Sequence, residues 1–134
     1  MALKQLNYPG AKPEQTVNTD WRLYFLDTAM TVTTTVTTVA WSTFDCSSKI
    51  PEGAVAVLVE LEWSKSGGSL SRLDFRKRSG AQAVLGVSAT ATDTGNAQVV
   101  VPILSSKWRR SFDYEVTGSS FGTSLTVKIL GYYK

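Results

Sequence analysis

Histidine is absent from this 134-residue sequence, and cysteine occurs once, as Cys46. Histidine is the usual general base near neutral pH and the commonest metal ligand, so catalytic sites of the Ser-His-Asp and Cys-His types are excluded. A single thiol allows no intrachain disulfide, and it falls short of the several thiolates that a zinc site without histidine needs. The residues of most catalytic centres and metal sites are therefore missing.

Paired carboxylates are the remaining candidates for catalysis. Glu60 and Glu62 stand two residues apart, as do Asp113 and Glu115, and a strand would hold each pair about 7 Å apart, a spacing that glycoside hydrolases use. The same spacing arises wherever one face of a strand meets water, without any chemistry. No Gly-rich segment carries the Lys-Ser/Thr ending of a phosphate-binding loop. We therefore predict that the chain is not an enzyme and binds no cofactor or metal.

Long hydrophobic runs are also missing from the sequence. No segment approaches the roughly 20 apolar residues of a membrane-spanning helix. The first ten residues lack the apolar stretch of about seven or more residues that a secretory signal peptide requires. We therefore expect a protein that is made in the cytoplasm, without an export signal and without a membrane partner.

Positive charge exceeds negative charge only slightly, with 14 Lys and Arg against 11 Asp and Glu and a net charge of +3. Nucleic-acid-binding domains usually concentrate their cations on one face or in one run. Here the cations of residues 72–78 are interrupted by Asp74, and those of residues 107–110 are followed by Asp113 and Glu115. Such clusters are typical of solvated strand edges, and we predict no nucleic-acid partner.

Alternation of apolar and polar residues is the dominant pattern in the rest of the chain. Residues 54–63 show it best, because the odd-numbered positions from Val55 to Trp63 are all large and apolar. Runs of the same kind occupy residues 21–25, 36–46, 70–76, 82–92, 98–104, 112–116 and 124–133. The turn-forming sequence of residues 93–96 (DTGN) predicts a hairpin between two of these runs. No segment shows the 3.6-residue period of a helix.

About eight strands separated by Gly- and Ser-rich turns predict an all-β fold, a single antiparallel β-sandwich domain over residues 20–134. A jelly roll, which has eight strands in two sheets, is our first choice of topology. An immunoglobulin-like sandwich is the alternative. The single cysteine argues against it, because its Cys…Trp…Cys signature needs two.

The first 19 residues differ from the rest of the chain, because they show neither a strand period nor a helix period. A Pro-Gly pair and a further proline interrupt regular structure there, so we expect an extended N-terminal arm over residues 1–19. Its apolar residues Leu3, Leu6 and Tyr8 would suit docking against a neighbouring molecule. A frayed terminus is the alternative.

Four tryptophans are many for a chain of this size. Trp21, Trp41 and Trp63 fall in alternating strand patterns, and we expect all three in the core. Cys46 follows Phe44 in a similar pattern. We expect this cysteine to be buried and unreactive, since its neighbours include no cation or base.

Trp108 stands apart from the strand patterns, since it follows two serines and lies among cations that include Arg109 and Arg110. An aromatic ring beside cations at the end of a loop suits a protein interface or stacking on a sugar. The C-terminal residues Tyr132 and Tyr133 offer further amphipathic rings of the kind enriched at interfaces. We predict that these five residues contact a partner.

Two segments combine strands and turns in a characteristic order. The first joins residues 41–45 (WSTFD) to residues 50–57 (IPEGAVAV), and the second is the ending at residues 127–134 (VKILGYYK). The first resembles the strand, turn and buried strand of fibre-tip and decoration domains, and the second is similar to their terminal strand. Residues 36–63 and 111–134 thus resemble small jelly-roll accessory virion proteins of tailed bacteriophages.

The resemblance implies a homo-oligomeric virion protein, with a trimer favoured, that assembles in the host cytoplasm. The first hypothesis is a capsid decoration or cement protein, whose partner is the major capsid protein or another virion protein. The alternative is a tail-fibre or spike receptor-binding module that uses Trp108 on glycans of the host surface. A free carbohydrate-binding lectin is a third interpretation.

Overall fold

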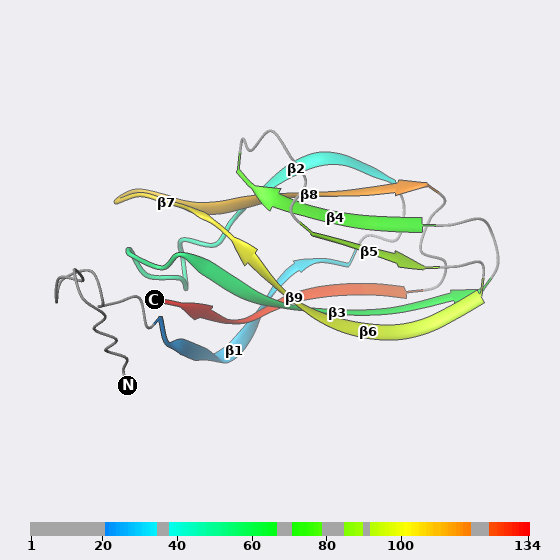
Figure 1. Cartoon of the computed structure of the whole chain (residues 1–134), viewed down its shortest axis with the longest axis horizontal. Helices are drawn as coiled ribbons and strands as arrows, with labels where there is room; N and C mark the ends of the chain where they lie inside the picture. Colours follow the sequence, from blue (N-terminus) through cyan, green and yellow to red (C-terminus); the bar gives the residue numbers. More distant parts are fainter. Residues whose placement is uncertain (1–20, 35–37, 67–70, 79–84, 90–91, 119–123) are drawn as a thin grey trace, which may run out of the picture.

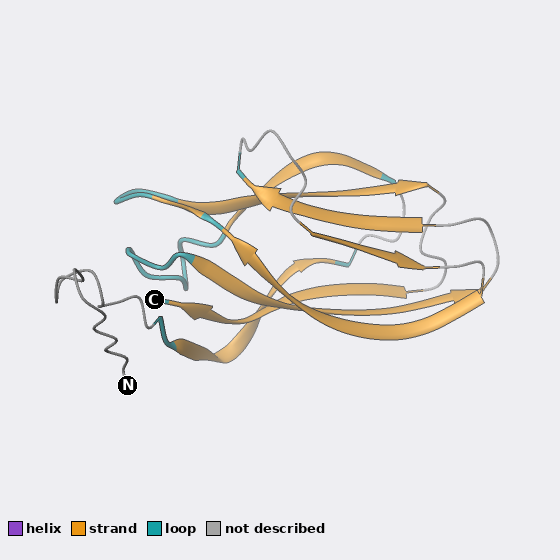
Figure 2. Ribbon diagram, in the orientation of Figure 1, coloured by secondary structure: helices purple, strands orange, loops and turns teal. Residues whose placement is uncertain are grey.

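The computed structural model describes residues 21–34, 38–66, 71–78, 85–89, 92–118 and 124–134. Among these residues there are nine β-strands and no helix (Figures 1 and 2). The strands are β1 (Leu23–Thr33), β2 (Val39–Asp45), β3 (Ala56–Ser66), β4 (Ser71–Lys77), β5 (Leu85–Ala89), β6 (Thr92–Pro102), β7 (Leu104–Ser105), β8 (Arg110–Gly118) and β9 (Ser124–Tyr133). The described part of the chain thus contains no helix that is long and apolar enough to cross a membrane.

The strands form two sheets that pack face to face (Figure 1). One sheet has the order β1-β9-β3-β6, and the other has the order β2-β8-β4-β5, with the short β7 also paired to β8. All neighbouring strands in the described chain are antiparallel. This order, in which the chain crosses repeatedly from one sheet to the other, is that of a jelly roll. The predicted all-β, jelly-roll-like sandwich is therefore confirmed.

The core lies between the two sheets, and β3 is its central strand. β3 pairs with β6 on one side and with β9 on the other. Val57, Val59 and Leu61 are fully buried on its inner face, which is the face that the alternation predicted. Phe75 of β4 and Phe112 of β8 come from the opposite sheet and are also fully buried. Burial of these apolar side chains is the main source of the fold's stability.

The hairpin predicted at residues 93–96 is wrong. Those residues lie inside β6, where they pair with residues 62–65 of β3, and β5 and β6 belong to different sheets. Local turn preference is outweighed by continuous pairing with the central strand. The glycine in this segment has a packing role instead, because a Cβ on Gly95 would lie 2.7 Å from Cζ2 of Trp63.

Of the three tryptophans expected in the core, only Trp63 is buried there. Trp41 lies on the outer face of its sheet, where the guanidinium of Arg76 is 4.1 Å from the ring centroid. Phe44 packs on the core from the same strand, and alternation therefore directs Trp41 to the opposite face. Trp21 precedes β1 and is 62% exposed.

Candidate functional site

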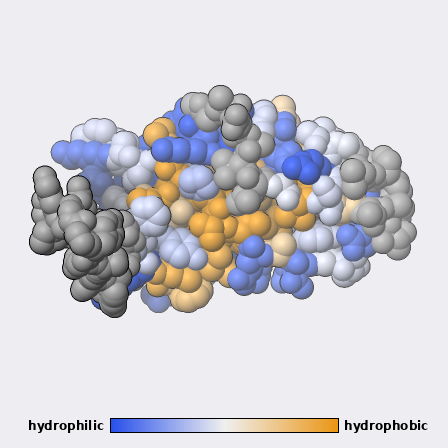
Figure 3. All heavy atoms as spheres, viewed as in Figure 1, coloured by the Kyte–Doolittle hydropathy of each residue, from blue (hydrophilic) through white to orange (hydrophobic). Residues whose placement is uncertain are grey.

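Large hydrophobic side chains are exposed at one end of the sandwich, where β1 begins and β9 ends (Figure 1). The exposed large hydrophobic residues of the described chain are Trp21, Tyr24, Phe25, Val100, Leu104 and Trp108. We call this set without Val100, which lies further along β6 opposite Leu58, the apolar end. The residues of the apolar end come from the start of β1, in the four-stranded sheet, and from the hairpin between β7 and β8, in the five-stranded sheet. Figure 3 shows hydrophobic residues reaching the surface over β1. Large exposed aromatic side chains, such as Phe25 and Trp108, are candidates for contact with a partner.

Trp108 occupies the tip of the β7–β8 hairpin. The backbone N–H of Ser106 donates to the carbonyl of Arg109 at 2.9 Å, and the N–H of Arg109 donates to Oγ of Ser106 at 3.2 Å. Lys107 and Trp108 therefore form the two-residue loop between these hydrogen-bonded positions. The Trp108 side chain is 81% exposed, and the ammonium of Lys107 lies 5.0 Å from its ring centroid. The hairpin thus projects an aromatic ring beside a cation.

Arg110 holds the base of this hairpin. Its guanidinium donates to the carbonyl of Ile50 at 2.8 Å and to the carbonyl of Ser47 at 2.9 Å, both in the β2–β3 connection. It also donates to the carbonyls of Ser106 and Lys107, each at 3.3 Å. Charge-assisted hydrogen bonds of this kind are about twice as strong as neutral ones. Arg110 therefore fastens two loops that are more than fifty residues apart in the sequence.

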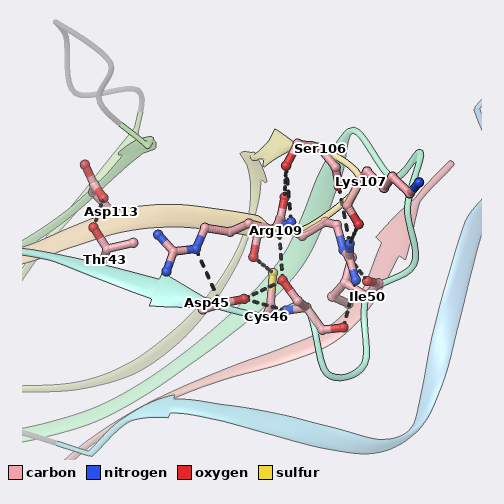
Figure 4. A network of polar contacts seen from close by, with 10 residues as sticks. Thr43, Asp45, Cys46, Ile50, Ser106, Lys107, Arg109 and Asp113 are labelled. Atoms are coloured by element: carbon pink, nitrogen blue, oxygen red, sulfur yellow. Dashed lines mark hydrogen bonds and ion pairs between the residues drawn. The ribbon is translucent and has the colours of Figure 1, made fainter.

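Residues 45–47 add a second set of contacts to the same base (Figure 4). The N–H of Arg110 donates to Oγ of Ser47, and the N–H of Cys46 donates to the carbonyl of Arg110, both at 2.8 Å. Hydrogen bonds from Ser47 lower the pKa of Asp45, and the nearby Arg109 lowers it further. Asp45 is therefore charged and lies 3.4 Å from Nε of Arg109. The hairpin is held in place before any partner arrives.

The Cys46 thiol is expected to resist iodoacetamide in the native protein at mildly alkaline pH and to react once urea unfolds the chain. Burial raises the pKa of this thiol from 9.0 to about 11, and its side chain is fully buried, so little reactive thiolate forms. Because the pKa is higher in the folded state, the thiol supports folding below pH 9 and loses that contribution between pH 9 and about 11. Mass spectrometry would measure the alkylation, and equal rates for native and unfolded protein would contradict this prediction.

Three of the residues predicted as partner contacts lie together in the hairpin: Trp108, Arg109 and Arg110. Trp108 and Arg109 are exposed. The Arg110 guanidinium instead donates hydrogen bonds to backbone carbonyls of the same protein. Tyr132 packs against the core and stacks on the ring of Tyr24, with 5.3 Å between the ring centroids.

The remaining residues predicted as partner contacts are not part of the β7–β8 hairpin. Tyr133 is half-buried and lies between Leu23 of the edge strand β1 and Ala56 of β3. The predicted arm of residues 1–19, with Leu3, Leu6 and Tyr8, lies outside the described residues.

The start of β1 contributes exposed aromatic residues that the sequence interpretation missed. Phe25 is 67% exposed, and Tyr24 is exposed beside it. The signal was the adjacency of these two aromatics in a strand, because successive side chains point to opposite faces and one of the two must face outward. The outward position belongs to Phe25, since Tyr24 stacks on the inward-facing Tyr132.

The outer face of the five-stranded sheet carries charges that pair with one another. Nε of Arg76 lies 3.1 Å from Oδ2 of Asp113, and Oγ1 of Thr43 donates to Oδ1 of the same carboxylate at 2.8 Å. Nε of Arg72 lies 2.7 Å from Oδ1 of Asp74. Both carboxylates are buried beneath their partners. These groups hold β2, β8 and β4 together, and this gives Asp113, one of the candidate catalytic carboxylates, a structural role.

Among the described residues, no group of three or more Cys, Asp or Glu side chains is placed to hold a metal ion. No protein-family profile matches the sequence, and a comparison with curated proteins finds no similar one. Fold alone does not identify a function, because one fold supports many. The function must therefore be inferred from the chemistry of the surfaces.

Proposed function

We propose that this chain is a structural virion protein of a tailed bacteriophage, a capsid decoration or cement protein that binds the capsid surface as a homo-oligomer. The observation that carries the proposal is the apolar end, which holds five of the six exposed large hydrophobic residues of the described chain. The sequence resemblance to jelly-roll virion proteins supplies the virion context. A trimer is the favoured oligomer, and the virion is the site of action.

The chemistry of the apolar end suits a protein partner. Tryptophan and arginine are the residues most enriched among those that dominate binding energy at protein interfaces, and Trp108 and Arg109 are both exposed at the hairpin tip. Arg110 fixes the base of the hairpin through four hydrogen bonds to carbonyls. A preformed surface loses little conformational entropy on binding.

The start of β1 suits contact between copies of the chain. β1 is an edge strand of the four-stranded sheet, and unpaired edges are covered in many proteins by neighbouring subunits. Trp21 and Phe25 are exposed there, and packing against a second copy would remove them from water. In the proposed oligomer, β1 serves assembly and the hairpin serves attachment to the capsid.

Replacement of Trp108 by alanine is expected to weaken binding to the capsid by roughly thirtyfold or more, as removal of a dominant interface residue does. The thermal stability should stay unchanged, because the side chain is 81% exposed. Co-sedimentation with capsids that lack the protein would measure the affinity. Gln98→Ala, on an exposed residue of β6, is the control and should bind normally. Capsid density without any copy of this chain, or unimpaired binding of the Trp108→Ala variant, would contradict the proposal.

The alternative function is a tail-fibre or spike module that binds host glycans. Trp108 gives it little support, because the ring is 81% exposed on a projecting tip, where it would cover only one side of a sugar. A different surface, on the four-stranded sheet, provides stronger support for glycan binding.

A further inference from the structure

The outer face of the four-stranded sheet is hollowed where β9, β3 and β6 lie side by side. We call this hollow the polar groove, and its volume is about 390 Å³. Its polar lining side chains are Glu62, Ser64, Thr94, Asn96, Ser124 and Thr126. A volume of this size lies within the range of small-molecule binding sites.

Strand register arranges these side chains in two rows. Glu62 of β3 lies between Asn96 of β6 and Thr126 of β9, and the second row is centred on Ser64 in the same way. Neighbouring strands are about 4.8 Å apart, and successive side chains on one face are about 7 Å apart. The polar groups therefore cover an area of roughly 10 by 7 Å, comparable in size to a disaccharide.

The groove differs from the outer face of the opposite sheet in how its polar groups are used. On the five-stranded sheet, Arg76 and Asp113 satisfy each other. In the groove, the side chains of Glu62, Asn96 and Thr126 make no hydrogen bond or ion pair with any other residue that the structure describes. Their hydrogen-bonding capacity is directed to the solvent, and it is available to a ligand.

The composition of the lining selects the class of ligand. The groove contains one carboxylate and no cation, so phosphate, sulfate and acidic sugars would be repelled. Among the described residues, no group of three or more Cys, Asp or Glu side chains is placed to hold a metal ion, so the groove contains no metal site of that kind. A carboxylate accepts hydrogen bonds, an amide donates and accepts them, and hydroxyls do both, which matches a ligand covered in hydroxyl groups.

We propose that the polar groove binds a neutral glycan, with Glu62 and Asn96 as its main hydrogen-bonding side chains. Glu62 accepts hydrogen bonds from sugar hydroxyls, and its position in the middle strand lets it reach the centre of the ligand. Asn96, directly opposite in β6, donates and accepts hydrogen bonds at the side. Thr126 completes the row from β9.

This site is separate from the surface on which the proposed capsid attachment rests. Along β3, Glu62 is six residues from Ala56, which pairs with Tyr133 near the apolar end, and six strand residues span roughly 20 Å. A copy attached through its apolar end would therefore hold the polar groove away from the capsid. Substitutions should therefore be able to remove capsid attachment or glycan binding without affecting the other.

A glycan array carrying neutral and sialylated structures tests the proposal with the full-length protein. At least one neutral glycan should bind, and Glu62→Ala and Asn96→Ala should each weaken that binding by roughly tenfold, as loss of a hydrogen bond to a charged or amide group does. Both side chains are exposed, so both variants should fold normally. Circular dichroism would verify this.

Glu60→Ala is the matched control, because Glu60 is the preceding residue on the same face of β3 and lies outside the groove. It should bind the glycan as the unmodified protein does, and so should Trp108→Ala. Binding to no neutral glycan, binding lost in Trp108→Ala, or equal loss in Glu60→Ala and Glu62→Ala would overturn the proposal. Capsid binding by Glu62→Ala should be normal, so failure of this proposal and failure of capsid attachment are distinguishable.

Discussion

Replacement of Arg110 by alanine is expected to lower the free energy of unfolding by roughly 3 kcal/mol, because several hydrogen bonds to a charged group are lost together. The carbonyls of Ile50 and Ser47, which accept from the guanidinium at 2.8 and 2.9 Å, would lose their donors. The β2–β3 connection and the hairpin would then be free to separate. Urea unfolding followed by tryptophan fluorescence would measure the change.

The neighbouring residue provides the control for this experiment. Arg109 has the same side chain, but it is exposed, and its one ion pair within the described part of the chain is with Asp45, 3.4 Å away. Exposed ion pairs contribute about 1 kcal/mol or less, so Arg109→Ala should change stability little. Arg110→Lys should recover only part of the loss, because an ammonium cannot reach carbonyls in the forked arrangement of a guanidinium. Equal losses for Arg109→Ala and Arg110→Ala would show that the carbonyl contacts of Arg110 are unimportant.

Phe112→Ala is expected to produce the largest loss of stability, roughly 4 kcal/mol, which is typical of removing a buried phenylalanine. Phe112 is fully buried, and its ring centroid lies 5.8 Å from that of Phe44 and 6.0 Å from that of Phe75. These three rings join β2, β8 and β4 on the inner face of one sheet. Differential scanning calorimetry and urea unfolding would measure the loss.

Phe25→Ala is the comparison for this prediction. Phe25 is 67% exposed at the start of β1, so the same substitution there should change the free energy of unfolding by about 0.5 kcal/mol or less. If the Phe25 side chain packs between copies of the chain, its removal should instead weaken the oligomer, which light scattering would detect. A Phe112→Ala variant as stable as Phe25→Ala would contradict the assignment of the aromatic cluster to the core.

The sequence predicted the parts of the fold that depend on local alternation. Residues 54–63 were expected to form a central strand, and β3 (Ala56–Ser66) is that strand. Residues 93–96 were misinterpreted because their turn preference is local, whereas their pairing with β3 brings together residues about thirty positions apart. Pairing over such a distance leaves no trace in a short window of sequence.

The candidate site was predictable in its residues and unpredictable in their roles. Trp108 and its cations were recognisable from composition, and the hairpin does expose Trp108. The difference between Arg109 and Arg110 was not recognisable, because the carbonyls that occupy Arg110 come from residues 47 and 50, about sixty positions earlier. The polar groove was missed for the same reason, since its two rows are formed by three separate strands.

The Arg110 contacts have a consequence for how this protein can diverge. Among the described residues, the partners of the guanidinium are main-chain carbonyl oxygens, including that of Lys107. Every amino acid supplies such an oxygen. The side chains at positions 107 and 108 take no part in these hydrogen bonds, so the hydrogen bonds place no requirement on which residues stand there. Variants with different residues at the tip would keep the same hairpin backbone. Evolution or library selection could therefore change which partner the hairpin binds without lowering the free energy of unfolding.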